Sequence, residues 1–298
     1  MIIPILRVQD YNEIKGVSTK HPLISLIDQS KTKQMNFKEN QYYLTDLYMI
    51  FIKESWCAEI VYGRKTYDYQ AGTMIFMEPG QEFGIEYKDL PVSTPNGYAL
   101  VFHKDLMKGT SLEKKIKDFH FFSYQINEAL HLSDTEKKLI LSLFEKMDNE
   151  LLNPIDKHTR ELLVNHIELL LNYCKRYYER QFHTRVQAHL DVTEKLNKVL
   201  TQYYLKELQL KNGLPNVSYC ADQFGLSSNY FGDLIKQQLG VSAQSFIHDF
   251  VIEKAKYLFK DEDKSIKEIS YSLGFEYPNH FSRFFKERTG ISPSEYRC

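Results

Sequence analysis

The sequence has no long apolar run, no closely spaced cysteines and no large excess of charge of either sign. No apolar stretch in its 298 residues approaches the roughly 20 residues that a membrane-spanning helix needs. The formal net charge is −1, with 43% apolar and 26% charged residues. Residues 1–7 reach a charge too early to form the apolar core of a signal peptide. We therefore expect a cytoplasmic globular protein without membrane contact, long enough for two domains.

The sequence also lacks the usual signatures of an enzyme. The cysteines are Cys57, Cys174, Cys220 and Cys298. Their wide spacing excludes a zinc framework, and Cys220 falls on the inner face of an expected helix, where a buried thiol is expected. The β-rich part of the chain holds only His21 and His103, so the His-x-His pair of a metal-binding barrel is missing. No phosphate loop or Ser-His-Asp pattern occurs either. We expect no catalytic residue, no cofactor and no metal.

Aromatic residues are plentiful, with 21 Tyr and 19 Phe against one Trp. In the first 110 residues they join β-branched residues in short strand-like segments separated by turn signals. These segments are 42–52, 58–62, 67–69, 73–77 and 97–102. Their number and spacing favour a sandwich or a barrel. Its aromatics line a small-molecule pocket or, as is more common, fill the core; the residues in question are Tyr43, Phe51, Trp56, Tyr69 and Phe76.

Helical patterns follow the strands. Ser133 and Glu136 have the spacing of a capping box, and apolar residues then recur every three or four positions up to Leu151. A second helix is expected at about 156–181. Its apolar stripe must be covered, either by its own domain or by a second copy of the chain.

The last hundred residues carry one short pattern twice. Phe231, Lys236, Gly240, Ser242 and Phe246 return fifty residues later as Phe281, Lys286, Gly290, Ser292 and Tyr296. Each copy predicts a short helix, a glycine turn and a second helix with an apolar face. This is the layout of a helix-turn-helix, whose second helix lies in the DNA major groove. Two copies predict a protein that reads two successive grooves.

The second copy resembles the ending of the AraC/XylS family of bacterial transcription regulators. The matching residues are Ile266, Ile269, Gly274-Phe275, Phe281-Ser282-Arg283, Phe285-Lys286, Gly290, Ser292-Pro293 and Tyr296-Arg297. Ser270 replaces the family's alanine, and Val251 stands where many relatives have arginine. The resemblance implies a DNA-binding domain at 193–298 and a connector at 183–192. More weakly, a hairpin pattern ending at Pro79-Gly80 resembles a cupin, which implies a cupin-like barrel with added helices at 1–182 for effector binding and dimerisation.

In the second copy the apolar positions face the core and leave a polar face outward. The outward residues are Asn279, His280, Ser282, Arg283 and Lys286. By the family pattern, base contacts fall on Asn279, His280 and Arg283. Arg forks onto guanine and Asn pairs with adenine, each worth about 1–3 kcal/mol of discrimination. His280 either touches a phosphate or is simply solvated.

The first copy is a weaker candidate reader. Its outward residues are Ser228, Asn229, Gly232 and Asp233, with Lys236 near the helix end. Asp233 occupies the position of Arg283, so it either accepts from cytosine N4 or forms a salt bridge within the protein. Lysines and arginines at helix ends (Lys236, Lys264, Lys267, Lys286 and Arg288) contact phosphates or are solvated. The domain holds 14 basic and 13 acidic residues, so DNA affinity depends on where the charges lie.

The predicted fold is therefore α+β with two domains, a β-rich cupin-like barrel with helices and an all-α domain with two helix-turn-helix units. The predicted function is sequence-specific reading of double-stranded DNA by a transcription regulator. The resemblance further implies a homodimer, a small-molecule effector and recruitment of RNA polymerase. The alternative is a small-molecule-sensing module whose helical domain binds another protein.

Overall fold

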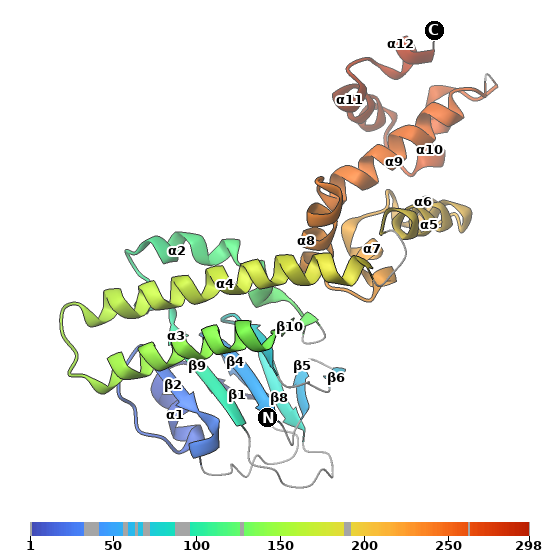
Figure 1. Cartoon of the computed structure of the whole chain (residues 1–298). Coiled ribbons are helices and arrows are strands. Elements are labelled where there is room, and N and C mark those ends of the chain that lie inside the picture. Colours follow the sequence, from blue (N-terminus) through green and yellow to red (C-terminus); the bar gives the residue numbers. More distant parts are fainter. Residues whose placement is uncertain are drawn as a thin grey trace. The chain divides into compact units, whose positions relative to one another are not determined.

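The computed structural model describes residues 2–32, 42–55, 59–62, 65–67, 72–86, 96–125, 128–187, 192–261 and 263–297. The chain divides into two compact units, Met1–Gln181 and Phe182–Cys298, which we call the N-terminal and C-terminal units. The N-terminal unit combines strands and helices, whereas the described part of the C-terminal unit is helical (Figure 1).

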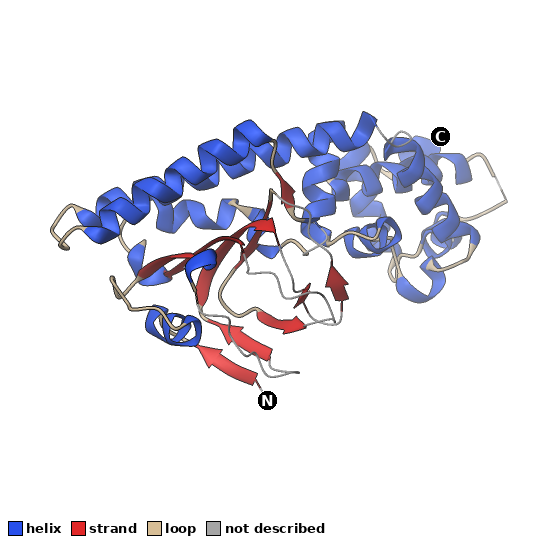
Figure 2. Ribbon diagram, turned by 60° about the horizontal axis from the view of Figure 1, so that its bottom comes forward, coloured by secondary structure: helices blue, strands red, loops and turns tan. Residues whose placement is uncertain are grey.

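The strands of the N-terminal unit form two five-stranded sheets (Figure 2). The first sheet has the order β1 (Ile2–Ile5), β3 (Tyr42–Thr45), β8 (Glu82–Glu86), β5 (Glu59–Tyr62) and β6 (Lys65–Tyr67). The second has the order β10 (Leu130–His131), β7 (Thr73–Met77), β4 (Leu47–Ser55), β9 (Asn96–His103) and β2 (Ile24–Asp28). Neighbouring strands are antiparallel except for the parallel pair β1–β3. The expected cupin-like barrel is not confirmed, because the described strands do not close into a single sheet.

The core of this unit lies between the two sheets. Side chains alternate along β4, so Met49 and Phe51 enter the core, where they join Phe83 from the other sheet. Ile50 and Ile52 on the opposite face of β4 are equally buried. A strand buried on both faces needs a layer on each side. On the outer face of the second sheet this layer is helical (Figure 1).

Helices and short 3₁₀ segments complete the N-terminal unit. They are α1 (Val8–Lys15), η1 (Gln29–Lys31), η2 (Lys104–Leu106), α2 (Ser111–Lys115), η3 (Ile116–Asp118), η4 (His120–Ser123), α3 (Asp134–Leu152) and α4 (Thr159–Gln187). The capping box predicted at Ser133 and Glu136 is confirmed, with the two reciprocal bonds at 3.4 and 2.8 Å. Tyr178 of α4 packs against Phe121 and Phe76, so the long helix covers β7.

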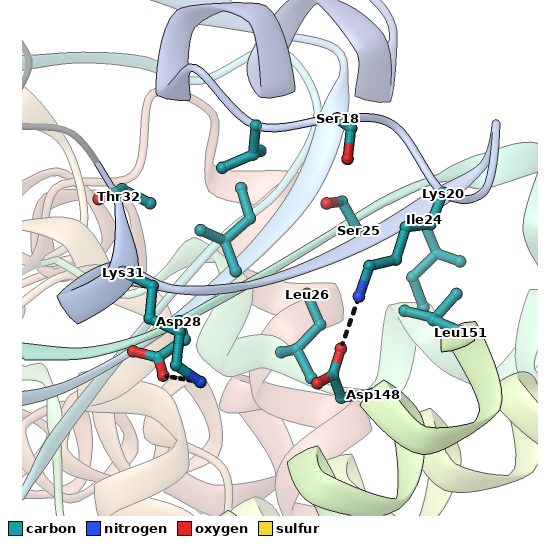
Figure 3. A pocket seen from close by; sticks show the side chains of 12 residues that line it. Ser18, Lys20, Ile24, Ser25, Leu26, Asp28, Lys31, Thr32, Asp148 and Leu151 are labelled. Atoms are coloured by element: carbon teal, nitrogen blue, oxygen red, sulfur yellow. Dashed lines mark hydrogen bonds and ion pairs between the residues drawn. The ribbon is translucent and has the colours of Figure 1, made fainter.

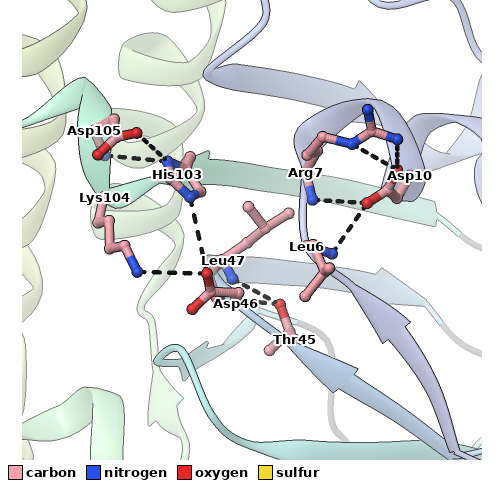
Figure 4. A network of polar contacts seen from close by, with 9 residues as sticks. All are labelled: Leu6, Arg7, Asp10, Thr45, Asp46, Leu47, His103, Lys104 and Asp105. Atoms are coloured by element: carbon pink, nitrogen blue, oxygen red, sulfur yellow. Dashed lines mark hydrogen bonds and ion pairs between the residues drawn. The ribbon is translucent and has the colours of Figure 1, made fainter.

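A polar network joins the end of β9 to the corner between β3 and β4 (Figure 4). His103 Nδ1 accepts the backbone N–H of Asp105 at 3.2 Å, and its Nε2 lies 3.9 Å from Asp46. Lys104 Nζ lies 3.5 Å from the same Asp46 carboxylate. His103 therefore caps a turn and links two strands. Within the described ranges, no group of His, Cys, Asp and Glu side chains is arranged to hold a metal ion.

The described part of the C-terminal unit after α4 is built from helices. They are α5 (Val192–Leu205), α6 (Gln209–Asn212), α7 (Val217–Phe224), α8 (Ser228–Leu239), α9 (Ala243–Leu258), α10 (Ile266–Leu273), α11 (Pro278–Thr289) and α12 (Pro293–Arg297). Of these, α6, α7, α8, α10 and α11 end at glycines. The positive φ angles expected at Gly225, Gly240, Gly274 and Gly290 are confirmed. Residues 183–187 of the expected connector belong to α4, and residues 188–191 lie outside the described ranges.

Two hydrophobic cores organise this unit, one for each copy of the repeat. Phe231 and Ile235 of α8 pack with Cys220 in the first core. Phe281 and Phe285 of α11 pack with Val251 in the second. The central helix α9 contributes to both cores, and Phe250 packs against each of them.

The turn between α10 and α11 is the tightest point of the second copy. A Cβ added to Gly274 would lie 3.0 Å from Gln209 Cβ, from the Gln209 carbonyl oxygen and from Gly213 C. The equivalent Gly225 has a similar left-handed backbone, with no such atom within 4 Å. Both positions require glycine for φ, but Gly274 also requires it for space.

We therefore expect Gly274→Ala to destabilise the protein more than Gly225→Ala. Each substitution forces alanine into the left-handed region at a cost of roughly 1–2 kcal/mol. Gly274→Ala adds a clash with backbone atoms, for which overpacking costs are about 1–3 kcal/mol. Urea unfolding of both variants, followed by circular dichroism, measures the difference. Equal losses of stability would show that the α10–α11 turn shifts without cost.

Candidate nucleic-acid interface

Each copy of the repeat folds as a helix-turn-helix. In the first, α7 contacts α8 through the turn at Gly225, and Ser227 caps α8 by accepting the Tyr230 N–H at 3.2 Å. In the second, α10 contacts α11 through the turn at Gly274. Pro278 occupies the first helical position of α11, where its missing N–H costs nothing. The second helix of each copy is therefore the candidate recognition helix.

The outward face of α11 is polar and accessible. Asn279, His280, Arg283 and Lys286 are exposed, and Phe281 and Phe285 are buried on the opposite side. Ser282 differs from the expectation, because it is half-buried and its Oγ donates to the Pro278 carbonyl oxygen at 3.1 Å. Its hydroxyl hydrogen is thus occupied within the helix. The side chains that remain open to a ligand on this face are an amide, an imidazole and two cations.

Arg283 has an ion-pair partner on its own helix. Its Nε lies 3.4 Å from Glu287 Oε1, and its side chain is 82% exposed. An exposed pair one turn apart is worth only a few tenths of a kcal/mol, so a stronger acceptor can replace Glu287. The guanidinium therefore remains available to a hydrogen-bond acceptor on a ligand.

The outward face of α8 is less open. Ser228, Asn229 and Lys236 are exposed, whereas Gly232 and Asp233 are half-buried. Asn229 and Asp233 both have interaction partners within the protein. Tyr230, which the sequence reasoning overlooked, is fully buried although it lies next to Asn229 in the first turn of the helix. Only the repeat, which aligns Tyr230 with the outward His280, could have drawn attention to it.

Arg288 at the end of α11 holds the central helix. It donates to Asp249 Oδ1 at 2.7 Å and to Ser245 Oγ at 3.1 Å. Its Nη2 lies 3.1 Å from His248 Nδ1. Burial and the nearby Arg288 charge lower the pKa of His248, so the neutral ring can accept this bond. Although Val251 stands where many relatives have arginine, α9 is held by more than packing, because Arg288 anchors it from outside its two cores.

The other cations at helix ends have varied surroundings. Lys264 pairs with Asp261 at 3.0 Å, whereas Lys236, Lys267 and Lys286 are exposed. Arg297, in the final part of the repeat, donates to the Asp261 carbonyl oxygen at 2.7 Å, which ties α12 to the loop before α10. The exposed lysines are accessible to a ligand.

Sequence comparison assigns this region to a family. The family described as a helix-turn-helix domain matches residues 220–298. The chain carries an AraC-type helix-turn-helix domain. The match covers the last half of α7 and everything after it, which includes both candidate recognition helices of the AraC-type domain.

The relatives of this chain are HTH-type regulators. It is 25% identical over 174 residues to the uncharacterized HTH-type transcriptional regulator YijO of Escherichia coli, an alignment spanning 58% of each chain. It is 36% identical over 77 residues to the HTH-type transcriptional activator RhaS of Escherichia fergusonii, spanning 26% of this chain and 28% of that protein. The chain thus matches less than two thirds of the length of either relative.

Among solved structures, the C-terminal domain of AraT, a response regulator from Geobacillus stearothermophilus, is 28% identical to this chain. The alignment covers 34% of this chain and 83% of that domain, with a TM-score of 0.30.

The N-terminal unit holds a cavity of about 250 Å³ beside β2 and α3 (Figure 3). Two ion pairs line it, Lys20–Asp148 at 3.2 Å and Lys31–Asp28 at 3.0 Å. Between them the Ser25 side chain, 8% exposed, faces the cavity. The cavity therefore offers a small polar molecule paired charges and a buried hydroxyl.

The aromatic pocket considered from the sequence is not at this cavity. Tyr43 and Phe51 lie in the core between the sheets, and Phe76 packs on the other face against Phe121 and Phe122. Trp56 and Tyr69 lie outside the described residues.

Within the described ranges, no helix is long and apolar enough to span a membrane.

Because Arg288 is tied to α9, we expect Arg288→Ala to act on stability and not on DNA affinity. The variant loses its bonds to Asp249 and Ser245, a cost of about 1 kcal/mol in unfolding free energy. Asp249→Ala and the double variant complete a cycle that measures the coupling. A fall of about one in the salt dependence of DNA binding would instead assign Arg288 to a phosphate.

Proposed function

We propose that this protein is a transcription regulator that binds specific double-stranded DNA through α8 and α11. The observation that carries the proposal is the pair of helix-turn-helix motifs joined by one central helix, with an exposed polar face on α11. Recognition helices fixed on one domain enter major-groove segments about one helical turn, roughly 34 Å, apart. The regulatory names of YijO and RhaS are consistent with this proposal.

Within this proposal α11 reads more bases than α8. It presents Asn279 and Arg283, whose side chains match adenine and guanine edges. In α8 the position of Arg283 is taken by Asp233, which is half-buried and engaged within the protein. Asn229 is the best candidate for a base contact from α8. Lys236 and Lys286 meet phosphates, Ser228 and Ser282 line the approach, and His280 contacts either a phosphate or solvent.

We assign effector binding and dimerisation to the N-terminal unit. Leu162 and Leu169 on α4 are 44% and 43% exposed, which leaves an apolar strip that a second copy would cover. We propose that the effector binds at the cavity around Ser25. The regulator would then act on RNA polymerase without any enzymatic step of its own.

The effector site can be tested by thermal unfolding against a panel of small polar metabolites. A compound that raises the melting temperature of the wild-type protein but not that of Ser25→Leu would support the cavity. Equal stabilisation of both proteins would place the effector elsewhere.

The main experiment is selection of binding sites from a random duplex library with the purified full-length protein. Two conserved blocks about one helical turn apart would support the tandem reader. Failure to enrich any sequence at low salt would favour the alternative, a sensing module whose helical domain binds a protein.

For the base contacts, we expect Arg283→Ala to weaken binding of the selected duplex by about 1–3 kcal/mol and to relax preference at one base. Lys286→Ala should weaken selected and random duplexes alike and lower the salt dependence by about one. Titrations of both variants against both duplexes at several salt concentrations distinguish the two roles. Equal losses on selected and random DNA would remove Arg283 from the base-reading residues.

The Arg283–Glu287 pair gives a further prediction. Glu287→Gln should tighten binding of the selected duplex by about twofold, because an exposed pair one turn apart is worth a few tenths of a kcal/mol. If Glu287 competes with DNA for the guanidinium, this gain disappears in the Arg283→Ala background. A gain that persists in that background would show a general effect of removing a negative charge.

A further inference from the structure

Tyr230 and His280 occupy the same position in the two copies of the repeat, yet their surroundings are opposite. Each is the third residue of its recognition helix. His280 is exposed on α11, whereas Tyr230 on α8 has 0% of its surface exposed. The two helices have the same length, and Phe231 and Ile235 of α8 are buried like Phe281 and Phe285 of α11, so the difference at the third position needs another source. A further segment must cover α8.

The covering residue is Phe182, near the end of α4 and within the C-terminal unit. Its ring meets the Tyr230 ring edge-on, with centroids 4.9 Å apart. Gln238, two turns further along α8, donates its side-chain amide to the Phe182 carbonyl oxygen at 3.1 Å. Phe182 is itself 3% exposed. The end of α4 is thus fastened to α8 at two points, a ring contact and a hydrogen bond.

The second copy shows what an uncovered first turn looks like. There the flank of α11 is covered by α9, through the His248 ring against Phe284 and the Arg288–Asp249 pair. These contacts from α9 begin at Phe284, one turn beyond His280. In the first turn of α11 His280 meets the exposed Tyr277 ring, with centroids 5.3 Å apart, and stays exposed. On α8 the cover extends back to Tyr230. The first turn is the part of a recognition helix whose side chains reach base edges.

We propose that the end of α4 and DNA compete for the first turn of α8. This inference rests on the proposed DNA-binding function. In the state described here the first turn of α11 is exposed, whereas the first turn of α8 exposes Ser228 and Asn229 but has Tyr230 buried against Phe182, so α8 engages fully only after Phe182 leaves Tyr230. The protein would therefore contact one block of its site first, and the second contact would be governed by the last turns of α4.

The test is hydroxyl-radical footprinting of the full-length protein on the duplex chosen by library selection. The wild type should protect the α11 block at lower concentration than the α8 block. Phe182→Ala should lower the concentration needed for the α8 block by roughly fivefold, as expected from losing one aromatic pair. Protection of the α11 block should not change.

Two further variants keep the test decisive if Phe182→Ala folds poorly. Gln238→Ala removes only the hydrogen bond to Phe182 and should give a smaller gain at the α8 block. His248→Ala is the matched control, because it removes an aromatic cover from the flank of α11 and should give no gain at either block. Thermal unfolding confirms that each variant is folded.

Equal protection of both blocks by the wild type, or no gain at the α8 block in folded Phe182→Ala and Gln238→Ala, would overturn the competition. Either result leaves the proposed function intact, because the α11 block is still protected. Protection of neither block by any variant would overturn the proposed function itself.

Discussion

The burial of α9 in two cores at once is the constraint on which the rest of the C-terminal unit depends. Ile247 belongs to the first core and Val251 to the second, with Phe250 in contact with both. Neither recognition helix could shift along α9 without opening one of these cores, since packed interiors tolerate little change of volume. The separation of α8 and α11 is therefore set by a single helix of 16 residues. Arg288 reinforces this arrangement from the surface, where it joins the end of α11 to Asp249.

Much of the C-terminal unit could be predicted because its signals are local. Glycines at helix ends and serine caps act over four residues, and the repeat doubles every signal. The short helix α7 ends at Gly225, at the glycine turn that the repeat predicts. The N-terminal unit was harder. β1 pairs in parallel with β3, some 40 residues away. A strand of four residues carries no sequence pattern that indicates so distant a partner. β8 carries Gly84 in its centre, which weakens the strand pattern.

In the candidate site, too, the features set by local sequence could be predicted, whereas those set by a distant partner could not. The exposure of Asn279, His280 and Arg283 followed from the helical period and the apolar residues between them. The state of Tyr230 and Arg288 did not, because each is decided by a partner outside its own helix: Phe182 in one case and Asp249 in the other. Ser270 shows a milder limit. Its hydroxyl is buried without a hydrogen-bond partner, a cost that only the packed structure reveals.

Among the described residues, each unit contains a deeply buried thiol, Cys174 in α4 and Cys220 in α7. Burial raises the pKa of both, to about 12 for Cys220, so neither forms the reactive thiolate near neutral pH. A thiol reagent would reach either sulfur only when the surrounding helices separate. The rates at which Cys174 and Cys220 are alkylated would thus follow the opening of the two units separately, in a single sample and without an engineered cysteine.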